Sequence, residues 1–94
     1  MDWLTQWVTT HGTESAAVEA LIAMRAQDGY VCGRVVDRLG KVDRDSPARY
    51  SAQAFFPDCG AENAANLPDD QRRVIAPESL LVECHAWERR HAMA

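Results

Sequence analysis

The first ten residues carry apolar side chains at a spacing that is compatible with one face of a helix. Four of them follow the order i, i+1, i+4, i+5, namely Trp3, Leu4, Trp7 and Val8. Such positions form one apolar stripe on a short helix. We therefore predict a helix over residues 2–10, which ends where Gly12 allows a left-handed turn.

The next segment has the clearest helical pattern in the chain. Its apolar residues recur at helical spacing and are Ala17, Val18, Leu21, Ile22 and Met24. Thr13 can act as the N-cap by accepting a hydrogen bond from the first turn, and the pair Asp28–Gly29 is typical of a turn. The pattern predicts a helix from residue 14 to about residue 27.

Between residues 30 and 56 the period of the pattern changes to two. The stretch "YVCGRVVDRLG" at 30–40 is rich in valine, and "ARYSAQAFF" at 48–56 alternates, and both features are typical of strands. The polar segment between them is too short for a helical crossover, so we expect an antiparallel pair. A third, short strand is predicted for "RRVIAP" at 72–77.

Residues 78–92 fit two patterns. As a strand, the segment would place Leu80, Val82, Cys84 and Ala86 on one face. As a helix, it would place Leu80, Cys84, Trp87 and His91 on one stripe. The many helix-forming residues favour a helix, and the clean alternation keeps the strand as the alternative.

We expect one α+β domain that spans residues 1–94. Two N-terminal helices would pack on a small antiparallel sheet of two to four strands, and the C-terminal segment would close the core. A chain of this length buries only about two-thirds of its unfolded surface. A deep catalytic cleft is therefore hard to fit unless two copies of the chain build it together.

The charge and composition disfavour several classes of protein. The formal net charge is −4, whereas a general nucleic-acid binder needs a basic face. No run approaches the roughly 18 apolar residues of a membrane span, and the first residues lack the features of a signal peptide. We therefore expect a cytoplasmic protein with three reduced cysteines. Arginine is used almost to the exclusion of lysine, which suits a GC-rich bacterial genome or a phage or other mobile element.

The stretch "VECHAWERRH" at 82–91 holds the residue types from which active sites and metal sites are built. On a helix, Cys84 and His91 would be separated by a rise of about 10.5 Å, too far for one zinc ion. Adjacent residues such as Cys84 and His85 diverge in either structure and make a poor catalytic pair. We therefore predict no catalytic residue, no metal site and no cofactor. The polar cluster Cys84, His85, Glu88 and His91 is kept as the runner-up site.

Two other features suggest a surface that binds a partner. Aromatic residues are enriched in the buried centres of interfaces, and residues 57–71 form a long acidic loop. The candidate partner surface comprises Trp3, Trp7, Phe55, Asp58, Glu62, Asp69 and Asp70. The preceding stretch, residues 30–49, holds five basic residues, so charge is segregated along the chain. These are Arg34, Arg38, Lys41, Arg44 and Arg49.

The function that fits best is non-catalytic. We expect a small accessory or inhibitor protein that binds another protein, with a homodimer left open. One alternative is a small enzyme or ligand-binding protein with a pocket at a dimer interface. A second alternative is a nucleic-acid binder that uses the arginines at 34, 38, 44 and 49.

Overall fold

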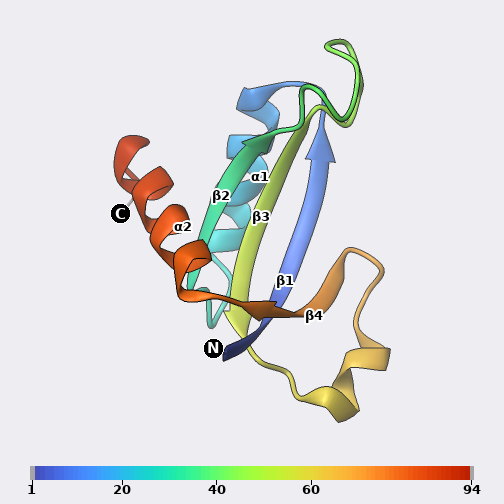
Figure 1. Ribbon diagram of the computed structural model, residues 1–94, viewed down its shortest axis with the longest axis vertical. Coiled ribbons are helices and arrows are strands. Elements are labelled where there is room, and N and C mark those ends of the chain that lie inside the picture. Colours follow the sequence, from blue (N-terminus) through green and yellow to red (C-terminus); the bar gives the residue numbers. More distant parts are fainter. Residues whose placement is uncertain (1, 94) are drawn as a thin grey trace.

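Residues 2–93 of the computed structural model form a four-stranded antiparallel sheet with two α-helices (Figure 1). Along the chain the elements are β1 (Asp2–His11), α1 (Glu14–Arg25), β2 (Cys32–Asp37), β3 (Tyr50–Pro57), β4 (Gln71–Ala76) and α2 (Glu78–Arg90). A 3-10 helix, η1 (Ala61–Asn66), lies between β3 and β4. The strand order across the sheet is β2-β3-β1-β4. Within residues 2–93, neither α-helix has the length and apolar character needed to cross a bilayer.

The predicted pair of N-terminal helices is wrong, because residues 2–11 form strand β1. On a strand, the same four apolar residues divide between the faces, Trp3 and Trp7 on one side and Leu4 and Val8 on the other. β1 pairs with both β3 and β4, so it lies inside the sheet and can bury apolar side chains on each face. Its β-branched residues, which favour strands, were the signal against a helix.

Helix α1 joins two strands that run in the same direction. β1 and β2 both pair antiparallel with β3, so they are parallel to each other with β3 between them. This is a split β-α-β arrangement. The helix begins where predicted, because the Thr13 side chain accepts a hydrogen bond of 3.2 Å from the backbone N–H of Ala16.

The face of the sheet beneath α1 is packed closely through small residues. Ala52 and Ala54 of β3 are fully buried together with Leu21 of α1. At Gly33 of β2, a Cβ atom would lie only 2.6 Å from Leu21 Cδ1 and 2.8 Å from the backbone oxygen of Gln53. The helix can therefore approach β2 only because position 33 has no side chain.

The C-terminal segment is helical, which is the alternative that its composition favoured. Helix α2 follows β4 directly and packs against the other face of the sheet, where Leu80, Leu81 and Cys84 surround Phe55. It then runs beside β2, as Figure 1 shows. We call the part of this face around Phe55, beneath α2, the covered end.

Candidate functional site: a basic groove on the sheet

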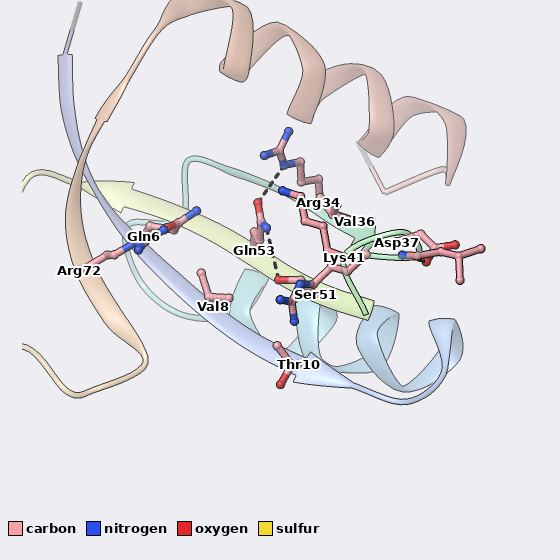
Figure 2. Close-up of a pocket in the computed structure, with 12 residues that line it drawn as sticks. Gln6, Val8, Thr10, Arg34, Val36, Asp37, Lys41, Ser51, Gln53 and Arg72 are labelled. Atoms are coloured by element: carbon pink, nitrogen blue, oxygen red, sulfur yellow. Dashed lines mark hydrogen bonds between the residues drawn. The ribbon is translucent and has the colours of Figure 1, made fainter. Parts of the chain in front are cut away.

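The remainder of the face that α2 partly covers forms an open groove of about 480 Å³. Its floor comes from three neighbouring strands and consists of Gln6, Val8, Thr10, Val36, Ser51 and Gln53. These positions alternate along β1, β2 and β3, so their side chains point to the same side of the sheet (Figure 2). We call this surface, with the charged residues around it, the groove.

The groove is bordered mainly by positive charge. Its basic residues are Arg34, Arg38, Lys41 and Arg72, and Asp37 is its one acidic lining residue. Asp37 accepts two hydrogen bonds, of 3.0 and 2.9 Å, from the guanidinium of Arg49, which together with a backbone N–H hold the pKa of Asp37 below its usual range. Arg49 offsets the charge of this carboxylate, so the groove is locally positive on a protein whose formal net charge is −4.

Hydrogen bonds hold two of the arginines in place along the floor. Arg34 donates from Nε to Gln53 Oε1 at 3.0 Å, and its Nη1 lies 2.7 Å from Glu83 Oε1 of α2. Arg72 donates from Nε to Gln6 Oε1 at 3.0 Å. Within residues 2–93, neither Arg72 nor Lys41 forms an ion pair with a carboxylate. These two side chains therefore carry positive charge that a negatively charged ligand can neutralise.

Most residues of the predicted partner surface lie around the opposite face of the sheet. Trp3 is stacked on the guanidinium of Arg73, 4.0 Å from the ring centroid, and Arg73 donates two hydrogen bonds to Asp58. The indole N–H of Trp7 donates to Asp70 at 2.8 Å. The structure thus brings together two tryptophans and two acids that the sequence places far apart.

The other three residues of that predicted surface behave differently. Glu62 and Asp69 are exposed in the connection between β3 and β4. Phe55 has no exposed surface, because it points to the other face and lies beneath α2 in the covered end. It therefore belongs to the core and cannot contact a partner in this conformation.

The polar cluster predicted in "VECHAWERRH" is only partly brought together. Cys84 of α2 is fully buried in a cluster with Cys32 and Phe55. Glu88, which is 5% exposed, accepts a hydrogen bond of 2.7 Å from the Tyr30 hydroxyl and has His85 Nδ1 at 3.2 Å from its other oxygen. The ring of His91 stacks on Trp87 instead, with centroids 4.0 Å apart. The described part of the chain holds no group of three or more metal-binding side chains that could share one ion.

The groove was missed at the sequence level because β1 was taken for a helix. A helix over residues 2–10 hides the polar alternation of Gln6 and Thr10, which form part of the floor. The sequence did contain one indication of the groove, which is the excess of basic residues in the stretch 30–49. Three of those five, Arg34, Arg38 and Lys41, line the groove, and Arg72 joins them from β4.

Comparison of the chain with protein-family models, with curated proteins and with solved structures finds no match in any of the three. The function is therefore argued from the geometry and charge of the groove.

Proposed function

We propose that this protein is a small non-catalytic binding protein whose groove takes an acidic segment of a partner protein. The observation that carries the proposal is the concentration of four basic side chains around an open sheet face on an otherwise acidic molecule. Charge complementarity of this kind selects partners and speeds their association. The ordered Gln6 and Gln53 side chains add polar groups that can bond a peptide backbone.

The lining residues favour a binding role over catalysis. They include no histidine, cysteine or glutamate, and the one carboxylate, Asp37, is held by Arg49. General acid–base chemistry most often uses such groups, and the hydroxyls of Thr10 and Ser51 would need one of them as a base to act as nucleophiles. What the groove offers is fixed N–H donors and positive charge, which suit recognition of carboxylates.

A protein partner fits better than a nucleic acid. The residues that line the groove include no aromatic side chain on which a base could stack. The net charge of −4 also opposes long-range attraction of a polyanion. Of the four arginines considered for nucleic-acid binding, Arg34 and Arg38 line the groove, Arg44 does not, and Arg49 is paired with Asp37.

The test measures binding of a fluorescent octaglutamate peptide by anisotropy at low salt. The double variant Lys41→Ala/Arg72→Ala should weaken binding by about tenfold, because it removes two groove charges that have no acidic partner within residues 2–93. The matched control is Arg89→Ala/Arg90→Ala, which removes the same charge from the last turn of α2. This control should change the affinity by less than about twofold.

Two results would contradict the proposal. Equal losses in both double variants would show that only net charge matters and that the groove is not the site. Binding of a labelled single-stranded oligonucleotide in preference to the peptide, lost in the groove variant, would assign the groove to nucleic acid instead.

A second candidate function is self-association through the opposite face. Trp3 and Ile75 are cross-strand neighbours and remain 41% and 50% exposed, beside the outer edge of β4. Apolar residues at an open sheet edge can pair with another copy. We expect a concentration-dependent mass in light scattering that Trp3→Ala lowers; a monomeric mass at high protein concentration would remove this candidate.

A cytoplasmic location and an accessory or inhibitory role in a phage or other mobile element are kept as parts of this proposal. They are supported by the composition and by the unpaired cysteine thiols. Identification of the partner by affinity capture from the native host, with the groove variant as control, tests them directly.

A further inference from the structure

Two cysteines from distant parts of the chain meet in the covered end. Cys32 of β2 and Cys84 of α2 are unpaired thiols with no exposed surface, and they share one buried cluster with Phe55. Each thiol shifts the pKa of the other, as expected for two groups that lie close together in this cluster. Nothing in their spacing of 52 positions along the chain indicates this contact.

The surroundings of the two thiols are unequal. The neighbouring Cys32 thiol and the Arg34 guanidinium lower the pKa of Cys84. The neighbouring Cys84 thiol and burial raise the pKa of Cys32. Cys84 is therefore the sulfur that ionises first and the better nucleophile of the two.

The thiol pair lies close to the groove. Arg34 follows Cys32 by two positions on the same face of β2, and its side chain lines the groove. The same guanidinium bonds Glu83, the residue that precedes Cys84. Arg34 therefore connects the groove to the covered end, in which the two thiols lie.

We propose that Cys32 and Cys84 form a reversible disulfide when the folded protein meets a peroxide, and that this bond fastens α2 to β2. The two thiols come from elements that pack together, and they lie in one buried cluster, so the fold already holds them near each other. The half-buried Cys59, in the connection between β3 and β4, is not part of this pair.

The reaction balances with one hydrogen peroxide molecule for each disulfide. The Cys84 thiolate attacks one peroxide oxygen, the O–O bond breaks, and hydroxide leaves and takes up a proton to become water. The sulfenic acid on Cys84 is then attacked by the Cys32 sulfur, which loses its proton as the S–O bond breaks and a second water leaves. Two electrons pass from the sulfurs to the peroxide, and dithiothreitol returns them.

The experiment uses the full chain with Cys59→Ser, which leaves only this pair of thiols. After treatment of the folded protein with hydrogen peroxide, denaturation and iodoacetamide, the intact mass should show two hydrogens lost and no added alkyl group. Tryptic digestion should yield the peptide that contains Cys32 joined to the one that contains Cys84. The melting temperature should rise by about 10 °C and return after dithiothreitol, because the bond closes a long loop.

The controls are Cys32→Ala and Cys84→Ala in the same background, in which neither the cross-linked peptide nor the rise in melting temperature should appear. Full alkylation of both thiols after peroxide would overturn the proposal. So would sulfinic acid on Cys84 without a cross-link, or a cross-link that lowers the melting temperature. The Cys59→Ser chain alone decides these outcomes, whether or not the alanine variants fold.

Discussion

One face of the sheet has two ends, one of which lies beneath helix α2 while the other is open. In the covered end, Cys32 and Phe55 are register partners and are fully buried. Two residues further along the same strands, Arg34 and Gln53 are register partners and line the groove. The change from apolar to polar side chains marks where α2 leaves the sheet. The comparison shows that the core end combines apolar strand residues with a covering helix, whereas the end that can bind carries polar strand residues.

The largest effect is expected in the covered end. Phe55→Ala removes the largest fully buried side chain and should lower the free energy of unfolding by about 3–5 kcal/mol. Gln53→Ala is the matched control, two residues away on the same face, and should cost about 1 kcal/mol or less. Urea denaturation followed by circular dichroism measures both. Similar losses at the two positions would mean that the two ends do not differ as described.

The sheet beneath α1 should tolerate added volume poorly. Gly33→Ala would bring a methyl group against Leu21 Cδ1 and the Gln53 backbone oxygen, and should cost about 1–3 kcal/mol of stability. Gly12 is the control, because neither Gly12 nor Gly33 has a positive φ, and a Cβ atom at Gly12 would meet no atom beyond its chain neighbours closer than 3.6 Å. If Gly12→Ala destabilises the protein as much as Gly33→Ala in thermal melts, contact with α1 is not the cause.

The contact between Tyr30 and α2 should be worth about 1–2 kcal/mol. Tyr30→Phe removes the hydroxyl that donates to Glu88, and leaves a carboxylate that is 5% exposed with one hydrogen bond fewer. Tyr50→Phe is the control, because Tyr50 has no such bond to α2. Equal stability of the Tyr30→Phe variant and the unsubstituted protein in urea would show that this contact does not hold α2.

The same contact predicts loss of stability in alkali. Burial and the carboxylate of Glu88 raise the pKa of Tyr30 above the unfolded value of about 10. A group whose pKa is raised on folding stabilises the folded state fully below its unfolded pKa, and this contribution decreases as the pH rises above that value. Unfolding monitored between pH 9 and pH 12 should therefore show an alkaline decrease that is smaller in Tyr30→Phe. An unchanged decrease would assign it to other groups.

The smallest effect on stability is expected in the groove. Lys41→Ala should change the free energy of unfolding by less than about 0.5 kcal/mol, because the side chain is exposed and has no acidic partner. It should nevertheless weaken octaglutamate binding several-fold. Arg89→Ala is the control for charge. A large loss of stability in Lys41→Ala would show that the groove is part of the structural core, like the covered end.

Local patterns predicted several elements well and one badly. The cap at Thr13 predicted the start of α1, and the alternation in residues 48–56 predicted β3. Residues 2–11 were misread, because a strand inside the sheet carries apolar residues on both faces and can imitate a helical stripe. Because residues 2–10 were predicted as a helix, β1 was missing from the predicted sheet. The groove could then not be predicted, since residues of β1 form part of its floor. The sequence shows the basic residues of the stretch 30–49. It does not show that some of them line the same groove as Arg72.

The sequence by itself indicated helix α1 and strands β2, β3 and β4, the acidic balance, and the separation of basic and acidic segments, while it left residues 78–92 open between helix and strand. Only the tertiary structure decided that α2 covers one end of the sheet face, that Cys32 and Cys84 share one buried cluster, and that Lys41 and Arg72 border one groove. These are contacts between residues more than 30 positions apart, and they depend on strand order and helix placement, which periodicity within a segment does not specify.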